Sequence, residues 1–216
     1  MPVGVIRRRD RQARLGCAGA TFWLIRRIFS TAILAALLAA GIQMARPPDG
    51  IPPAQRANEA QAGQLLQAVQ TLAASTYARA IDVTQAEANN YLAASIVPDP
   101  EATGKPLRAD FNRAFVVIKS AELDFFVEQR FHGWPIYMHL TAVPEPSGAK
   151  MSLRVTGGGV GRMPFSPRLI PLLEGVLGPV IASTSEAAAV LETADEVVLA
   201  PSIAKLSWRA RKPALP

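Results

Sequence analysis

Thiol and imidazole side chains are scarce in this chain of 216 residues. It contains one cysteine, Cys17, and two histidines, His132 and His139. A single cysteine permits no disulfide within the chain and no zinc site built from several cysteines. The two histidines are an odd number of positions apart, which puts them on opposite faces of a shared strand. We therefore expect no metal and no cofactor, and a fold stabilised by an ordinary hydrophobic core.

Sequence motifs that carry catalysis are also missing. The chain has no Gly-x-Ser-x-Gly, no His-Glu-x-x-His and no paired Cys-x-x-Cys. The stretch Gly157–Arg162 lacks the Lys-Ser/Thr ending of a phosphate loop and leads to Pro164, so we expect a strand bulge or a tight exit from a strand there. Glu122, Asp124 and His139 are the remaining candidates for acid/base chemistry. We predict that the protein is not an enzyme.

Acidic residues are nearly absent from the first 27 residues, which hold seven arginines and one aspartate. This segment accounts for the whole net charge of +6, so the rest of the chain is neutral. Nucleic-acid binding requires a basic face on the folded part of a protein. We therefore expect no nucleic-acid partner, and we assign the positive charge to membrane orientation and to anionic lipid headgroups.

An uncharged apolar run follows, from Ile28 to Ala45. As a helix its 18 residues span about 27 Å, close to the roughly 30 Å hydrocarbon core of a bilayer. Because positive flanks stay in the cytoplasm, residues 1–27 are predicted to be a cytoplasmic tail and residues 28–45 a single transmembrane anchor. The remainder is then extracytoplasmic, attached to the inner membrane.

Cleavage of this segment is the alternative to a retained anchor. Ala39-Ala40-Gly41 offers a small-x-small cleavage site of the kind that signal peptidase cuts. The long arginine-rich leader and the length of the apolar run favour retention. Leu15-Gly16-Cys17 resembles a lipoprotein acylation site, but Arg14 stands where an apolar residue is required.

Beyond the anchor, residues 46–53 are rich in proline and are predicted to form a stiff spacer, and residues 54–212 an α+β domain. A helical stripe of apolar residues runs through 54–77. Thr84 and Glu87 form a capping box, which predicts a helix through Leu92. The stripe consists of Leu65, Leu66, Val69, Leu72 and Ala73.

Alternating apolar residues then predict an antiparallel meander, with strands near 115–131, 134–142 and 151–156 and turns near 132–133 and 144–148. Ser166-Pro167 predicts a helix start, and apolar spacing continues from Leu169 to Ile181. We expect a kink or a break at Gly178, a helical piece over 185–193 and a closing strand up to Trp208. The predicted fold is an antiparallel meander sheet covered by a long kinked helix.

A resemblance to a known group enters at Thr84-Gln-Ala-Glu-Ala-Asn-Asn-Tyr-Leu92. Together with the N-terminal anchor, the alternating strands and Gly161-Arg162-Met163-Pro164 before a helix, this segment resembles the YpmS-like group of bacterial membrane-anchored extracytoplasmic proteins. Proteins of that kind are similar in outline to tubular lipid-binding folds. The resemblance implies that the domain handles a hydrophobic ligand, without identifying it.

Three functional hypotheses follow. In the first, a non-catalytic envelope protein binds a lipid or another hydrophobic ligand between the sheet and the covering helix. In the second, the helix over 54–77 docks the protein into an inner-membrane assembly. In the third, an enzyme uses Glu122, Asp124 or His139. The residues expected to line the hydrophobic site are Phe115, Leu123, Phe125, Val127, Leu169, Leu173, Val176 and Leu177.

Overall fold

The computed structural model describes residues 6–96, 109–148 and 150–210. The chain divides into two compact units, Met1–Ile42 and Gln43–Pro216. Helix α1 (Ile6–Ala45) forms the first unit, and its last three residues belong to the second. Within α1, the stretch Ile25–Ala45 is long and apolar enough to cross a membrane, and none of it is buried. This stretch contains the predicted anchor over 28–45.

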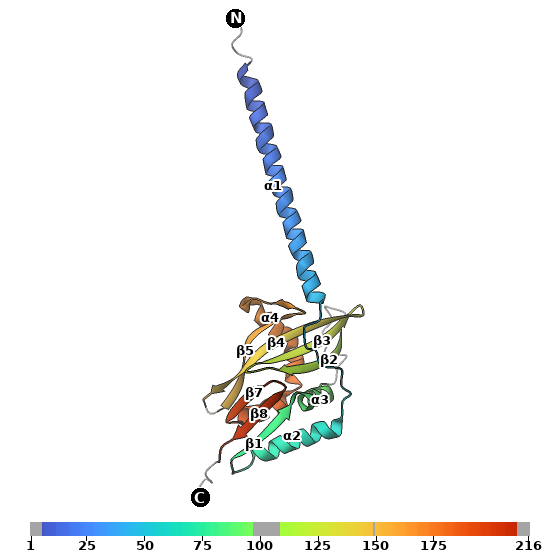
Figure 1. The fold of residues 1–216 in the computed structure, drawn as a ribbon, viewed down its shortest axis with the longest axis vertical. Helices are drawn as coiled ribbons and strands as arrows, with labels where there is room; N and C mark the ends of the chain where they lie inside the picture. Colours follow the sequence, from blue (N-terminus) through green and yellow to red (C-terminus); the bar gives the residue numbers. More distant parts are fainter. Residues whose placement is uncertain (1–5, 97–108, 149, 211–216) are drawn as a thin grey trace. The chain divides into compact units, whose positions relative to one another are not determined.

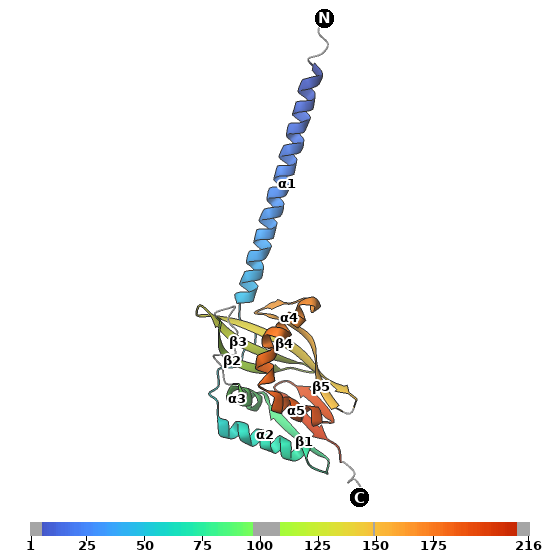
Figure 2. The same cartoon turned by 180° about the vertical axis from the view of Figure 1, so that it is seen from behind.

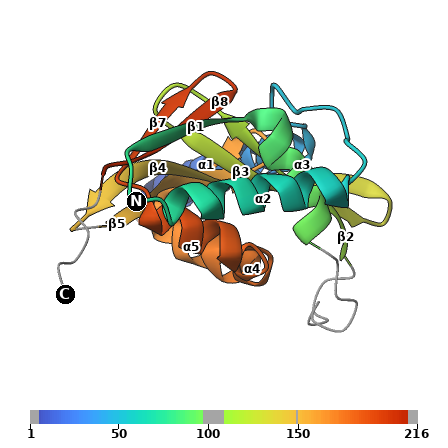
Figure 3. The same cartoon turned by 90° about the horizontal axis from the view of Figure 1, so that it is seen from below.

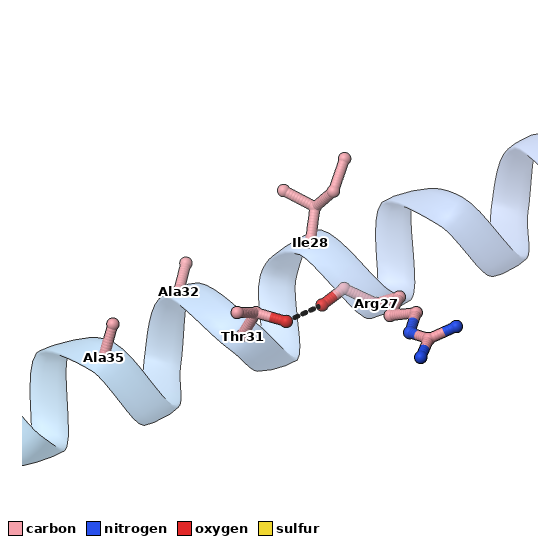
Figure 4. A pocket seen from close by; sticks show the side chains of 5 residues that line it. All are labelled: Arg27, Ile28, Thr31, Ala32 and Ala35. Carbon is pink, nitrogen blue, oxygen red and sulfur yellow. Dashed lines mark hydrogen bonds between the residues drawn. The ribbon is translucent and has the colours of Figure 1, made fainter.

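The side chains of Ile25–Ala45 are not buried in a protein core. Ile28 and Leu37, for example, are 62% and 65% exposed. The Thr31 hydroxyl donates to the Arg27 carbonyl at 2.8 Å and thereby satisfies its hydrogen-bonding capacity inside the helix (Figure 4). The shallow hollow in Figure 4 is lined by residues of this one helix, from Arg27 to Ala35, and is not an enclosed site.

The larger unit contains an antiparallel five-stranded sheet, ordered β2-β3-β4-β5-β6 (Figure 1). This order confirms the predicted meander. The strands are β2 (Ala109–Ile118), β3 (Leu123–Phe131), β4 (Trp134–Ser147), β5 (Lys150–Val160) and β6 (Met163–Pro164). The hairpin between β3 and β4 turns at His132 and Gly133, which both have positive φ, as a two-residue type I′ connection requires.

Strand β4 extends through the proline-rich segment that was predicted to be a turn. It pairs with β3 only as far as Ala142, and then continues with β5 alone to Ser147. Pro144 and Pro146 therefore lie where β4 has become an edge strand on its β3 side, and there proline's missing N–H costs no ladder hydrogen bond. A register shift opposite Thr141 and Ala142 confirms an irregularity beside the glycines of β5.

A second, three-stranded sheet has the order β1-β8-β7. Its strands are β1 (Arg79–Thr84), β7 (Glu196–Ala200) and β8 (Ile203–Trp208). The prediction of one closing strand was therefore wrong, because the chain reverses at Ser202, whose φ is positive, and forms a hairpin. Strand β8 pairs with β1 along its whole length, which joins the two ends of the domain sequence.

The helices begin and end with recognisable capping. Helix α2 (Glu59–Ala73) starts after Asn58, whose side chain accepts from the Gln61 amide, so it is shorter than the predicted 54–77. Helix α3 (Gln85–Ser95) carries the predicted capping box between Thr84 and Glu87. Helix α5 is Ser185–Thr193, as predicted.

The covering helix differs from its prediction. Ser166 makes no side-chain cap bond, and Pro167–Leu169 form a 3₁₀ turn, η1, before α4 (Ile170–Ala182). Helix α4 continues through Gly178 and Pro179, and the break comes at Ser183 and Thr184 instead. One proline inside a helix removes one hydrogen bond, and the packing of α4 on the sheet outweighs that loss.

Three apolar clusters fill the larger unit. The first lies between one face of the five-stranded sheet and helices α3 and α4, and the third lies on the opposite face of that sheet. The second joins α2, α5, the small sheet and Met151 of β5. Figures 2 and 3 show α4 and α5 following one another along the sheet and α2 beside α3, α5 and β1.

Candidate functional site

The residues of the predicted hydrophobic site are divided among the first cluster, the opposite face of the sheet and the outer side of η1 and α4. Val127, Leu173 and Leu177 are 0–3% exposed and belong to the first cluster, against which Phe125 also packs. Leu169 and Val176 lie on the outer side of the η1 and α4 segment, 45% and 50% exposed. The sheet-facing residues of α4 therefore fill the space where a ligand was expected.

Phe115 lies on the other face of the sheet. It pairs in register with Phe126, and their rings stack with centroids 5.0 Å apart. The sequence pattern grouped Phe115 with Phe125, because both occupy odd positions. Pairing in the hairpin places odd positions of β2 beside even positions of β3, so the two residues face opposite ways. Leu123, the first residue of β3, is half-buried.

The face that carries Phe115 also holds two buried carboxylates. Glu128 is 5% exposed; it accepts hydrogen bonds from Asn112 Nδ2 at 2.6 Å and from Arg113 Nε at 2.7 Å. Arg113 in turn donates to the Pro52 carbonyl and lies over the Phe115 ring. This network ties the segment after the anchor to the sheet.

Asp124 is the second buried carboxylate, 4% exposed. It accepts from Thr141 Oγ1 at 2.6 Å and forms an ion pair with Lys119 Nζ at 2.6 Å. The hydrogen bond to Asp124 raises the pKa of Lys119, against the opposing effect of burial. Glu122, the other proposed acid, lies at the surface beside the same lysine at 3.3 Å.

His139 lies on this face, opposite Phe126, with their rings 5.1 Å apart. Its Nδ1 is buried and has no hydrogen-bond partner among the described residues. Burial lowers the pKa of His139, an effect that Asp124 opposes and Lys119 reinforces. No group of three or more His, Cys, Asp or Glu side chains able to hold a metal occurs in the described ranges.

The lowered pKa of His139 predicts how stability depends on pH. Above the ordinary value of 6.5 the ring is neutral in both the folded and the unfolded chain. As the pH falls through 6.5, the unfolded chain takes up the proton first, so the free energy of unfolding decreases. Urea denaturation between about pH 7.5 and about pH 5.5 should show this decrease, and His139→Asn should reduce it. An unchanged pH dependence in that variant would contradict the buried neutral ring.

Contacts from Arg162 and Gly161 hold the first residues of the larger unit in place. The Arg162 amide donates to the Gln43 carbonyl at 2.9 Å, and Arg162 Nε donates to the Pro47 carbonyl at 2.9 Å. The Arg162 guanidinium also forms an ion pair with Asp49. Gly161, at φ +58°, approaches so closely that a Cβ there would overlap the Met44 carbonyl oxygen. We name these contacts the anchor clasp.

Replacing Gly161 by alanine is expected to open the anchor clasp. Both the positive φ and the overlap with Met44 oppose a side chain there. Gly148→Ala is the matched control, because Gly148 has a similar φ of +65° and nothing within 4 Å of the added Cβ. The Arg162 amide, which donates to the Gln43 carbonyl, should exchange its hydrogen with solvent several-fold faster in Gly161→Ala than in Gly148→Ala, on the order of the effect of losing 1–2 kcal/mol. Equal exchange rates at Arg162 in the two variants would show that Gly161 is not needed to keep the clasp closed.

The sheet face beneath the spacer leaves little room for a ligand. A hollow of about 30 Å³ is lined by spacer residues Pro52 and Pro53 together with Asn89, Arg113 and Phe115, among others. That volume corresponds to about one water molecule. The sequence analysis named Asp124 but not Glu128, although Arg113, which pairs with Glu128 in the β2–β3 register, was an available signal.

Comparisons with protein-family models, with curated proteins and with solved structures found no match to this chain.

Proposed function

We propose that this protein is a single-pass inner-membrane protein with an extracytoplasmic domain that binds a lipid or another hydrophobic ligand and does no chemistry on it. The apolar stretch Ile25–Ala45, none of which is buried, supports the anchor. A helix of this length from the core of a soluble protein would be largely buried. The arginine-rich segment before it supports an N-terminus in the cytoplasm.

The single observation that carries ligand binding is the apolar character of α4 on both sides. Its inner residues Leu173 and Leu177 fill the core, while Leu172 and Val176 on the outer side are 64% and 50% exposed. A helix that is apolar all round is typical of a helix covered on all sides. No described element covers the outer side of Leu172 and Val176, so we assign that side to the ligand.

Lipid is the ligand we assign to the outer face of α4, because α4 follows the segment that contacts the end of the apolar stretch. The Arg162 amide donates to the Gln43 carbonyl in the last turn of that stretch, and α4 begins eight residues later at Ile170. Eight residues span at most about 28 Å even when fully extended, so the start of α4 lies within that distance of Arg162.

Photocrosslinking tests this assignment with the full chain in vesicles that contain a phospholipid with a diazirine on its acyl chain. Adducts are expected on α1 and on α4. Leu172→Ser with Val176→Ser should lower the α4 adducts several-fold and leave those on α1 unchanged. The control is Val198→Ser with Ile203→Ser, since these residues are 48% and 40% exposed on the small sheet. Labelling of α4 no stronger than that of the small sheet would refute lipid binding at α4.

The second candidate is an interaction subunit of an inner-membrane assembly. The predicted docking stripe on α2 packs inward, with Val69 buried and Leu65 and Leu72 against the second cluster. The outer face of α4 is the surface that favours this candidate instead. Absence of lipid adducts on α4 in an anchored protein would shift the proposal to such a partner.

A further inference from the structure

The β3–β4 hairpin ends in a pair of exposed aromatic residues. Trp134 is 75% exposed and Phe131 is 37% exposed, and the two are cross-strand partners on either side of the turn. The intervening His132 and Gly133 have φ of +49° and +83°, which fits a tight two-residue turn. Phe131 packs edge-on against His132 at 4.6 Å, and neither aromatic belongs to a core cluster.

This tip is close to the end of the apolar stretch, and the connection lies entirely within the larger unit. The Gln43 carbonyl accepts from the Arg162 amide, and the neighbouring Gly161 amide donates to the Tyr137 carbonyl at 2.7 Å. Trp134 is three residues from Tyr137 along β4, or about 10 Å. The tip therefore lies on the same part of the larger unit as Gln43, the residue with which that unit begins.

The hairpin tip lies in the part of the larger unit that adjoins the end of the apolar stretch. The 21 residues of the stretch span about 31 Å as a helix, close to the roughly 30 Å of a hydrocarbon core, so the proposed anchoring puts Ala45 at the end of the membrane-spanning part. Exposed side chains of the larger unit beside Ala45 can then reach the headgroup region. Tryptophan is enriched at this depth, because its ring is apolar and its N–H is polar.

The charges around the tip fit anionic headgroups. Arg46, Arg130 and Arg168 are exposed on the segments that meet at this end of the sheet. Two acids lie on the same segments: Asp49, which is paired with Arg162, and Asp110, which is opposite Arg130 in register. In Figures 1 and 2 the segment that leads into α4 lies at this end as well, whereas the β4–β5 hairpin lies at the opposite end.

We infer that the β3–β4 hairpin is a second membrane contact, in which Trp134 and Phe131 insert into the headgroup region of an anionic bilayer beside the anchor. This inference rests on the anchoring proposed above. Two points of attachment would hold the domain at a fixed height, with the start of α4 turned to the lipid. A single flexible tether would let the domain tumble.

Tryptophan quenching by brominated lipid tests the inference. Full-length protein with Trp23→Phe is reconstituted in vesicles of anionic phospholipid brominated near the top of its acyl chains. The two remaining tryptophans are Trp134 and Trp208, and the latter is 2% exposed in the core. The lipid should quench a large part of the emission. The quenched part should disappear with Trp134→Phe, leaving the unquenched Trp208.

Flotation of the same vesicles separates the two proposals. If the protein does not float with the lipid, the anchoring itself is wrong. If it floats while brominated lipid leaves the Trp134 emission unchanged and aqueous iodide quenches it, the hairpin is in solution and the inference is overturned. Flotation with lipid quenching and protection from iodide supports both.

Discussion

Arg113→Ala is expected to destabilise the domain by about 3 kcal/mol, because it leaves the buried Glu128 carboxylate without its ion-pair partner. The estimate is at the low end for a broken buried pair, since 22% of the Arg113 side chain is exposed and water can partly replace it. The variant also loses the hydrogen bond to the Pro52 carbonyl and the contact with the Phe115 ring. The measurement is urea unfolding of the full chain in mild detergent.

Two further variants separate the pair from a general effect of losing an arginine. Arg113→Ala with Glu128→Gln should recover about half of the loss, since the buried group left without its partner is then a neutral amide. Arg154→Ala removes the exposed ion pair with Glu145 and should cost less than about 1 kcal/mol. Equal losses in the Arg113 and Arg154 variants would contradict a buried ion pair at Glu128.

Leu177→Ala is expected to cost about 3 kcal/mol, because the side chain is fully buried between α4 and the sheet and its removal leaves a cavity. The adjacent Val176→Ala is the matched control, with a change within about 0.5 kcal/mol at a half-exposed position of the same helix. Both changes put alanine into α4, so helix propensity works in the same direction in each. The comparison is made by urea unfolding.

A small loss for Leu177→Ala would mean that α4 rests loosely on the sheet. The predicted ligand space between Leu173, Leu177 and Val127 would then be open after all. The two variants therefore decide between a closed core and the originally expected binding site, independently of any lipid measurement.

Most elements of the fold could be predicted from patterns among residues that are near in sequence. The capping box at Thr84 and the alternation over 123–131 predicted α3 and β3 correctly, because each depends on residues near in sequence. The closing hairpin and the second sheet were missed, since pairing of β8 with β1 joins segments more than a hundred residues apart. Local patterns contain no information about such pairings.

The candidate site was harder to predict than the fold. Odd and even positions along one strand show which of its residues share a face. Which residues of two neighbouring strands share a face depends on the register of their pairing. Pairing of Phe115 with Phe126 therefore put Phe115 on the face opposite Phe125. On α4 the apolar residues were recognised, but their number exceeds what one face can hold. Leu169 and Val176 were expected to line the ligand site between the helix and the sheet, and they lie on the outer, exposed side.

The boundary between the two units falls after Ile42, one residue beyond the small-x-small site at Ala39-Ala40-Gly41. A cleaved chain would thus keep Gln43 and the whole anchor clasp. The folded domain is compatible with both cleavage and retention of the apolar stretch. Retention must therefore be tested by detecting the N-terminal segment itself.

Cysteine accessibility in intact spheroplasts tests the central claim most directly. Cys17, the chain's one cysteine, reports on the N-terminal tail, and Ser147→Cys in a Cys17→Ser background reports on the exposed end of β4. The account predicts that a membrane-impermeant maleimide labels position 147 in intact spheroplasts and Cys17 only after lysis, both in the membrane fraction. Labelling of Cys17 from outside, protection of position 147, or a soluble product that lacks Cys17 would contradict it.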